Sequence, residues 1–166
     1  MKIMMSAGEA SGDMHAAAVA AEIKREYPDA DIFGMGGDNM RNAGVRIIYD
    51  IGNLGIIGVV EVIRHLSLFF KLRTFLRHAM MEEKPDVVVC VDYPGFNMKI
   101  AHVAKELGIP VVVAINMMDI VKKNGDTIHI DKLKKALGCE VVEISALKGT
   151  GITEAANKAV SIAQSH

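Results

Sequence analysis

The sequence predicts an α/β protein with a parallel β-sheet between two layers of helices. Short apolar runs of strand length alternate with longer segments of helical pattern, which is the rhythm of strand–helix–strand units. The runs Val87–Val91 and Val111–Val113 are apolar without alternation, as expected of central parallel strands that are buried on both faces. We therefore expect a doubly wound, three-layer sheet of six strands within one domain, residues 1–166.

Each predicted strand is a short, mostly apolar run, and each predicted helix is a longer segment between two such runs. The strands are expected at Lys2–Ser6, Asp31–Met35, Arg46–Tyr49, Val87–Val91, Val111–Ile115 and Val141–Ile144. The helices are expected at Gly12–Glu26, Val59–Arg64, Leu66–Glu83, Asn97–Leu107, Asp131–Leu137 and Ile152–Ala163. Gly108 and Gly138 follow two of these helices, where glycine commonly ends a helix in the left-handed conformation.

Composition excludes several classes of function. The 166 residues are 51% apolar and 23% charged, which suits a compact domain. The net charge of −1 provides no overall field for nucleic acid, so we expect no nucleic-acid partner. The longest uncharged stretch, Leu107–Met118, is shorter than the roughly 20 apolar residues of a transmembrane helix. Because the N-terminus also lacks the pattern of a signal peptide, we expect a cytoplasmic protein without a transmembrane segment.

Cysteines and histidines give no indication of a metal site. Cys90 and Cys139 lie inside apolar runs, which predicts buried thiols rather than a disulfide or metal ligands. His15 and His65 are the histidines that could approach the ends of the strands. No two histidines have metal-ligand spacing with a third candidate, so all six are predicted to be surface or helix-cap residues.

A loop that contains glycine and serine, Gly8–Asp13, follows the first strand. Ligands of open parallel sheets bind at the carboxyl ends of the strands, and backbone N–H groups at a helix N-terminus favour an anion. The loop is not a phosphate loop, because no lysine follows Gly12 and because Glu9 and Asp13 are acidic. The favoured interpretation is a tight turn in which Ser11 or Asp13 caps the first helix, and a working phosphate site is the alternative.

Four motifs before Val112 resemble the N-terminal half of lipid-A-disaccharide synthase, a glycosyltransferase with two Rossmann domains. They are Ser6–Asp13, Gly34–Gly37, Asn53–Glu61 and Val91–Asn97. In that family the nucleotide-sugar donor is held mainly by the C-terminal domain, and the enzyme is peripheral to the inner membrane. Because we find no counterpart of that domain, the resemblance implies no detectable sugar transfer.

The same resemblance implies a site at the end of the fourth strand. Asp92 would face the acceptor sugar as a catalytic general base on a hydroxyl group. The same cleft would be lined by Gly8, Ser11, Glu61 and Asn97. The alternative is that Asp92 only initiates a turn ahead of the Pro-Gly pair that follows it at positions 94 and 95.

From about Leu107 onward, the chain resembles the second half of the GTPase domain of ferrous iron transport protein B. The matching segments are Val113–Asp119, Leu137–Cys139 and Ile144–Ile152. The resemblance implies a guanine site in which the Asp119 carboxylate accepts two hydrogen bonds from the base edge and Asn116 ties neighbouring loops together. Ser145 and Ala146 would close over the base.

Two limits apply to this guanine site. Asn116 and Asp119 have the alternative role of capping the helix that follows the fifth strand. The lysine of a phosphate loop and the Ser or Thr that binds magnesium are not recognisable in the sequence. We therefore expect no cofactor beyond weak GDP or GTP binding.

The segment Glu106–Val112 fits both families, so the simplest explanation is a chimera, engineered or recombined. Residues 1–110 would derive from the glycosyltransferase and residues 111–166 from the GTPase. Both families place a helix, a turn and a parallel strand here, so the right-handed crossover continues and a Rossmann-like sheet of order 3-2-1-4-5-6 is expected. We expect a folded hybrid without catalytic activity. The alternatives are weak guanine-nucleotide binding, and binding of acceptor lipid, sugar or membrane surface without glycosyl transfer.

The helix around Leu66–Arg77 is apolar with interleaved basic residues. The synthase family uses such a surface to meet the membrane and its lipid substrate, and a helix of this composition can bury its apolar side chains among lipid headgroups. Ordinary packing against the sheet is the alternative. If the apolar side chains are exposed, they favour self-association, so we expect a monomer or a weak dimer.

Overall fold

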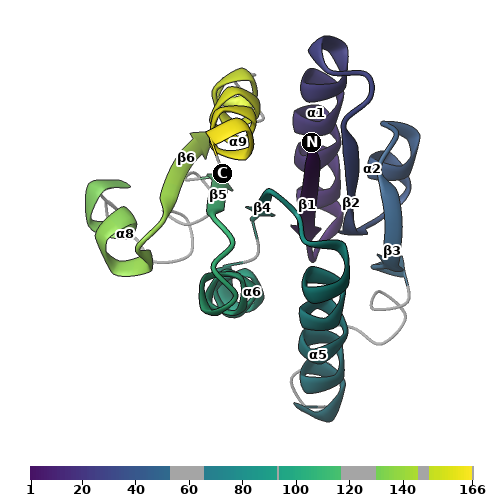
Figure 1. Cartoon of the computed structure of the whole chain (residues 1–166), viewed down its shortest axis with the longest axis vertical. Coiled ribbons are helices and arrows are strands. Elements are labelled where there is room, and N and C mark those ends of the chain that lie inside the picture. Colours follow the sequence, from purple (N-terminus) through teal and green to yellow (C-terminus); the bar gives the residue numbers. More distant parts are fainter. Residues whose placement is uncertain (53–65, 93, 117–129, 146–149, 166) are drawn as a thin grey trace.

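The computed structural model describes residues 1–52, 66–92, 94–116, 130–145 and 150–165, and these form a six-stranded sheet with helices on both faces (Figure 1). All neighbouring strands are parallel, in the order β3-β2-β1-β4-β5-β6, which confirms the predicted fold class and strand order. The strands are β1 Lys2–Ala7, β2 Asp31–Gly36, β3 Arg46–Asp50, β4 Val87–Val91, β5 Val111–Asn116 and β6 Glu140–Ile144.

The two valine-rich strands are almost completely buried, as predicted. β4 lies in the middle of the sheet beside β1, whereas β5 lies one strand further out, so the prediction that both would form the centre is wrong for β5. β5 is nevertheless enclosed, because β4 and β6 flank it and helices cover both of its faces. Full burial of a strand therefore does not require the central position.

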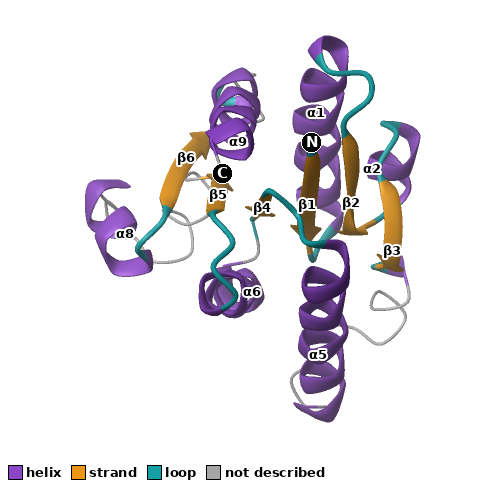
Figure 2. Ribbon diagram, viewed as in Figure 1, coloured by secondary structure: helices purple, strands orange, loops and turns teal. Residues whose placement is uncertain are grey.

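Five of the six predicted helices are found in the described residues, in the predicted order and with some differences in their bounds (Figure 2). They are α1 Ala10–Glu26, α2 Asp38–Asn42, α5 Leu66–Glu83, α6 Pro94–Glu106, α8 Ile130–Leu137 and α9 Ile152–Ser165. α1 and α6 begin earlier than predicted, and α6 begins at Pro94, which suits the first position of a helix. α2 was not predicted, because five residues are too short to show helical periodicity. The helix predicted at Val59–Arg64 lies outside the described residues.

Two apolar cores lie on the two faces of the sheet. On one face, α1 and α9 pack side by side, and their buried residues include Ala16 and Val19 of α1 and Ala155 and Ala159 of α9. On the other face, α5 and α6 pack against the sheet. Residues from before and after the predicted join thus share the α1–α9 core.

The segment around the predicted join is regular. The N–H of Val88 in β4 donates to the carbonyl of Pro110 at 2.9 Å, which leads directly into the β4–β5 pairing. Gly108 and Gly138 have φ angles of +75° and +65°, so the two predicted helix-ending glycines are confirmed. The Lys105 side chain bridges the join, because its Nζ donates to the carbonyl of Leu137 at 3.1 Å.

Glu83 at the end of α5 is expected to make the stability of the fold depend on pH in the acid range. Its carboxylate lies 2.8 Å from Arg46 Nη2 and 3.0 Å from Lys2 Nζ, and these partners lower the pKa of Glu83 from 4.5 to about 2. A carboxylate whose pKa is lowered by folding stabilises the folded state above its unfolded pKa and loses that effect as the pH falls toward its folded pKa. The contribution of Glu83 should therefore disappear between about pH 4.5 and 2.

Urea unfolding can check this expectation. The free energy of unfolding should fall more between about pH 6 and 3 for the unmodified chain than for Glu83→Gln, which has no carboxylate to protonate. Glu82→Gln is the matched control, since Glu82 is exposed and has no ion pair within the described part of the chain. An identical pH dependence of Glu83→Gln and the unmodified chain would contradict the expectation.

Candidate functional site

The side chain of Asp92 connects three elements at the carboxyl edge of the sheet. Asp92 follows β4 directly, and its φ angle of +52° is in the left-handed region, which aspartate tolerates better than most residues. Its Oδ2 lies 2.7 Å from Nδ1 of His15 in α1, and its Oδ1 accepts the N–H of Asn116 at 2.9 Å. The carboxylate is therefore held in place by α1 and by the end of β5.

Asn97 in α6 fixes the backbone beneath Asp92. Its Nδ2 donates to the carbonyls of Asp92 at 2.6 Å, Val91 at 3.0 Å and Ser6 at 3.2 Å, and its Oδ1 accepts the hydroxyl of Ser6 at 2.8 Å. Both Asn97 and Ser6 are buried, with 2% and 0% of their surface exposed. The structure thus places Asn97 below the edge of the sheet, where it joins the ends of β1 and β4.

Gly8, directly after β1, and Ser11, in the first turn of α1, lie beside this network and are half-buried, so the predicted loop Gly8–Asp13 is mostly helical. Gly12 allows α1 to approach β4 closely, because a Cβ at this position would lie 3.2 Å from the carbonyl oxygen of Val91. Glu9 is the N-cap residue of α1 and makes no side-chain capping bond. The prediction that Ser11 or Asp13 caps α1 is therefore wrong.

Asp13 instead stabilises the beginning of α2. It lies inside α1, is buried, and accepts the N–H groups of Gly37 at 2.8 Å, Met40 at 3.0 Å and Asn39 at 3.1 Å. Its own N–H is bonded to the carbonyl of Glu9 within α1, so the side chain is directed to the neighbouring loop. The partners lie at least 24 residues further along the chain, so local sequence patterns could not reveal them.

His15 is 5% exposed, so the prediction that all six histidines are surface or helix-cap residues is wrong for this one. Position 15 lies three residues after Gly12 and four before Val19, which places it on the buried stripe of α1. This spacing could have predicted that His15 is buried. By contrast, His102 is exposed and pairs with Glu106 at 3.0 Å.

The predicted guanine-binding residues lie at the ends of neighbouring strands. Asn116 is the last residue of β5 and is paired in register with Ile144 of β6, so Ser145 comes directly after its partner. The N–H of Ser145 donates to the carbonyl of Thr150 at 2.9 Å. The structure thus brings Asn116 and Ser145 to one edge together with Asp92. Asp119, Ala146 and Glu61 lie outside the described residues.

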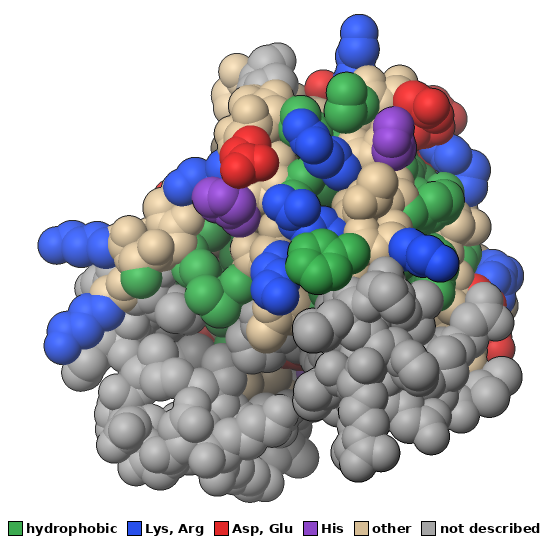
Figure 3. Space-filling model, turned by 90° about the horizontal axis from the view of Figure 1, so that it is seen from below, with side chains coloured by type: hydrophobic (Ala, Val, Ile, Leu, Met, Phe, Trp, Pro, Cys, Tyr) green, Lys and Arg blue, Asp and Glu red, His purple; other side chains and the backbone are tan. Residues whose placement is uncertain are grey.

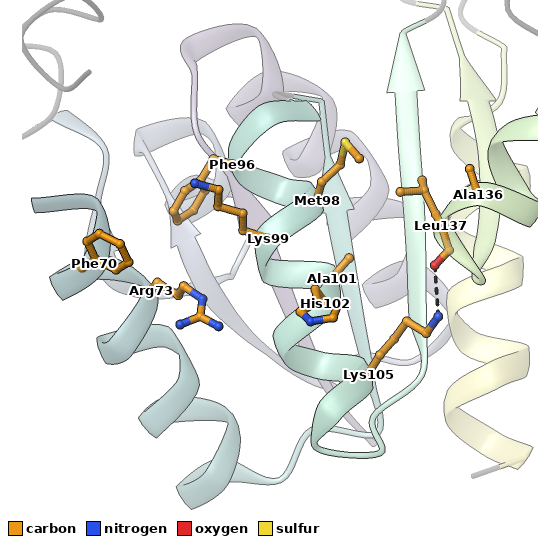
Figure 4. A pocket seen from close by; sticks show the side chains of 10 residues that line it. All are labelled: Phe70, Arg73, Phe96, Met98, Lys99, Ala101, His102, Lys105, Ala136 and Leu137. Carbon is orange, nitrogen blue, oxygen red and sulfur yellow. Dashed lines mark hydrogen bonds between the residues drawn. The ribbon is translucent and has the colours of Figure 1, made fainter. Parts of the chain in front are cut away.

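A pocket of about 580 Å³ lies between α5, α6 and α8 (Figure 4). Among the described residues, its lining side chains are apolar or basic and include no carboxylate; they are Phe70, Arg73, Phe96, Met98, Lys99, Ala101, His102, Lys105, Ala136 and Leu137. Arg73 and Lys99 have no ion pair within the described residues. The pocket therefore combines apolar walls with uncompensated positive charge.

The helices around this pocket form a basic surface. α5, α6 and α8 carry eight Lys and Arg against four Asp and Glu, whereas α1 and α9 on the opposite face carry three against four. Figure 3 shows apolar and basic side chains intermingled on this side of the molecule. In α5, Leu72 and Leu76 are buried while Phe70 and Phe75 are 63% and 44% exposed, so this helix packs against the sheet and also presents apolar rings to solvent.

The structure also bears on the predictions for the cysteines, for metal sites and for membrane-spanning helices. Cys90 is fully buried and Cys139 is half-buried; both are free thiols, and burial raises the pKa of each. Within the described ranges no group of His, Cys, Asp and Glu has the arrangement of a metal site. Among the helices whose placement is described, none is long and apolar enough to cross a membrane.

Comparison with solved structures supports the fold. The FeoB G-domain from Methanococcus jannaschii superposes with a TM-score of 0.58 at 26% identity, over 99% of this chain and 97% of that chain. A GMPPNP-bound NFeoB mutant from S. thermophilus gives 0.53 at 22% identity, over 98% and 62%. The calicheamicin glycosyltransferase gives 0.50 at 17%, over 82% and 42%. The last two identities indicate the fold alone.

Comparison of sequences identifies the family. The chain is 39% identical over 115 residues to the lipid-A-disaccharide synthase of Geobacter sulfurreducens and 41% identical over 114 residues to that of Nitrosococcus oceani. Each match covers 69% of this chain but 30% of the relative, so the chain spans about a third of the length of these relatives. The family model for lipid-A-disaccharide synthetase matches residues 3–115. The structural similarity to the FeoB G-domain also includes residues 3–115, because the synthetase family and the FeoB G-domain share the fold. The sequence match over these residues shows that the chain belongs to the lipid-A-disaccharide synthetase family.

Proposed function

We propose that the chain is a chimera, engineered or recombined, which binds a lipid-linked sugar acceptor without transferring a sugar to it. It would join the acceptor-binding part of a lipid-A-disaccharide synthase to the second half of a FeoB-like GTPase domain. The observation that carries the proposal is the position of the Asp92 carboxylate, held by His15 and by the N–H of Asn116. Asn116 lies one residue beyond the family match, so the site remains organised across the proposed join.

Hydrogen-bonding chemistry supports an acceptor of this kind. Carboxylate and imidazole groups at the edge of a sheet accept hydrogen bonds from hydroxyl groups, and a sugar offers several hydroxyls. Gly8 after β1 and Ser11 in the first turn of α1, both half-buried, lie beside them. We therefore propose acceptor binding as the activity of this site.

An amide-resolved NMR titration with octyl glucoside below its micelle concentration tests the proposal, because this probe combines a sugar with an alkyl chain. We expect shifts at Gly8, Ser11 and Asp92, and we expect Asp92→Asn to weaken them. Asp86→Asn is the matched control, since Asp86 lies at the opposite end of β4, where it accepts the N–H of Lys2 at 2.8 Å. Equal shifts in both variants, or none in the unmodified chain, would contradict the proposal.

The lipid part of the acceptor suggests a role for the basic pocket. We propose that the surface of α5, α6 and α8 docks on an anionic membrane, with Phe70 among the headgroups and Arg73 near their phosphates. A basic residue near such a surface contributes about 1 kcal/mol, or roughly a fivefold change in binding. Arg73→Gln should therefore lower binding to phosphatidylglycerol vesicles by about that factor in a cosedimentation assay.

Arg77→Gln is the control for this prediction. Arg77 lies one turn further along α5, is exposed, and does not line the pocket. Its replacement should have a smaller effect, and binding that depends on Phe70 should survive high salt, because apolar insertion is not screened. Equal losses for Arg73→Gln and Arg77→Gln would show that general charge attraction, rather than the pocket, holds the membrane.

Weak guanine-nucleotide binding is a second candidate function. It is favoured by the 26% identity to the Methanococcus jannaschii FeoB G-domain and by the positions of Asn116 and Ser145 at neighbouring strand ends. Adding GDP and magnesium should shift the amide signals of these two residues, and Asp119→Ala should abolish the shifts because the base loses its carboxylate partner. Dispersed spectra that do not change at millimolar GDP would exclude this candidate.

A further inference from the structure

The pocket between α5, α6 and α8 has the size and composition of a site for a small ligand. Its volume of about 580 Å³ lies within the range of roughly 300–1,000 Å³ for ligand sites, which combine mainly apolar walls with a few polar groups. All three helices supply apolar wall residues, with Phe70 in α5, Phe96 in α6 and Leu137 in α8. The pocket can therefore enclose part of a single molecule, whereas docking on a bilayer requires only an exposed surface.

Two of the four basic side chains in the pocket are available to an anion. Lys105 donates to a carbonyl of α8 at 3.1 Å, and His102 Nε2 lies 3.0 Å from Glu106, so these two already have partners. Arg73 and Lys99 make no ion pair or hydrogen bond with any residue that the structure describes. An anion in the pocket would therefore be bound by Arg73 and Lys99.

Arg73 and Lys99 lie on the same side of the pocket (Figure 4). Arg73 extends from α5 toward α6, and Lys99 extends from α6 toward α5. Arg73 is half-buried, so its side chain has lost part of its contact with water without gaining an acceptor in the described residues. A guanidinium offers a planar fork of N–H donors, which matches two oxygens of a carboxylate, sulfate or phosphate group. This side of the pocket is therefore suited to an acidic group.

The other side of the pocket is suited to an alkyl chain. Met98 is 50% exposed and lies on the side of α6 away from α5, and Ala136 and Leu137 of α8 complete the wall there. Methionine is unbranched and adapts to irregular apolar shapes. Ala136 and Leu137 lie beyond residues 3–115, which match the synthetase family, so the family resemblance does not imply this wall.

We propose that this pocket binds one amphiphilic anion, with its acidic head between Arg73 and Lys99 and its alkyl chain along α6 toward Met98 and α8. The inference goes beyond docking on a membrane, because it assigns a binding site for a single molecule. Free alkyl acids in water and single anionic lipids of a bilayer share this chemistry. The apolar walls hold the chain by burial, and the two cations select the charge of the head.

Octyl sulfate below its micelle concentration is the probe, and amide-resolved NMR of the labelled chain follows its binding. We expect saturable shifts at Arg73, Lys99 and Leu137. Arg73→Gln should weaken the affinity roughly tenfold, because hydrogen bonds to a charged group are lost. Arg77→Gln is the matched control, since Arg77 is exposed on the same helix and does not line the pocket, and it should leave the affinity unchanged. Equal losses in the two variants, or the same shifts with inorganic sulfate, would overturn the inference.

Ala136 tests the wall that α8 provides. It is exposed, so its replacement leaves the apolar cores intact. Ala136→Glu adds a carboxylate to the pocket, and Ala136→Gln adds a side chain of nearly the same size without charge. We expect Ala136→Glu to bind octyl sulfate several-fold more weakly than Ala136→Gln, because the carboxylate repels the anion. Equal affinities of the two variants would overturn the inference.

Phosphatidylglycerol vesicles separate this inference from the proposed function. Vesicle binding without saturable binding of octyl sulfate would overturn the inference and leave the proposed docking standing. Saturable binding of octyl sulfate without vesicle binding would overturn the docking and support the inference, with a free alkyl acid as the ligand. Binding of both would support the inference with a single lipid of the bilayer as the ligand.

Discussion

Replacing Gly34 with alanine should strongly destabilise the sheet. Gly34 in β2 pairs with Met5 of β1 and has a φ angle of +150°, and a Cβ here would lie 1.8 Å from the carbonyl oxygen of Met5. The obstructing atoms belong to the backbone of a buried strand, so they cannot move aside as a flexible side chain would. We expect a loss of more than about 4 kcal/mol, a large part of the stability of a typical domain, measured by urea unfolding followed by circular dichroism.

Gly95→Ala is the matched control for this substitution. Gly95 is exposed in the first turn of α6, and a Cβ there would have no neighbour within 4 Å. Alanine should leave the stability unchanged or raise it by about 0.5–1 kcal/mol, because it restricts the unfolded chain. Similar unfolding curves for Gly34→Ala and Gly95→Ala would show that β1 and β2 do not approach as closely as described.

Asn97→Leu should cause the second large loss. Leucine has nearly the same size but cannot bond the hydroxyl of Ser6 or the carbonyls of Ser6, Val91 and Asp92, which lie at the buried ends of β1 and β4. Leaving a buried polar group without its partner costs about 1–3 kcal/mol, so several such groups together should cost about 3 kcal/mol or more. Urea unfolding measures this loss.

The variant Ser6→Ala measures the contribution of the Ser6–Asn97 side-chain hydrogen bond apart from the other bonds of Asn97. It removes one hydrogen bond and leaves the amide of Asn97 on its carbonyl partners, so we expect a loss of about 1 kcal/mol. If both variants lose the same amount, the three carbonyl contacts of Asn97 contribute nothing measurable. A loss in Asn97→Leu should also weaken binding of octyl glucoside, because Asn97 anchors the carbonyl of Asp92.

The sequence was sufficient for most of the architecture. The strands and the long helices follow from local periodicity, and apolar runs such as Val87–Val91 are buried because they lie between two layers of helices. The short helix α2 escaped prediction because it is too short to show periodicity and because the groups at its start are bonded by Asp13 of another helix. Local sequence patterns predict which side chains of a segment are buried. They do not predict which distant group the segment will bond.

The candidate site also contains features that the sequence could predict and features that it could not. Asp92 and Asn97 could be singled out through a family resemblance, and the structure brings them together. The pairing of His15 with Asp92 joins residues 77 positions apart, and the contact of Asn116 with Asp92 spans 24. Both depend on which strands are neighbours in the sheet and on how deeply α1 is seated. Tertiary packing determines the strand order and the position of α1, so the spacing of residues along the chain cannot predict these two contacts.

The contact between α1 and α9 has a consequence for how α/β proteins exchange parts. The buried residues of these two helices are mainly alanine and valine, such as Ala16 and Ala20 of α1 and Ala156 and Ala163 of α9. Small side chains form shallow ridges, so two helices that did not evolve together can slide past each other until they fit. A fold whose outer helices meet through such smooth surfaces can tolerate recombination, so that the two parts of one chain can come from different families.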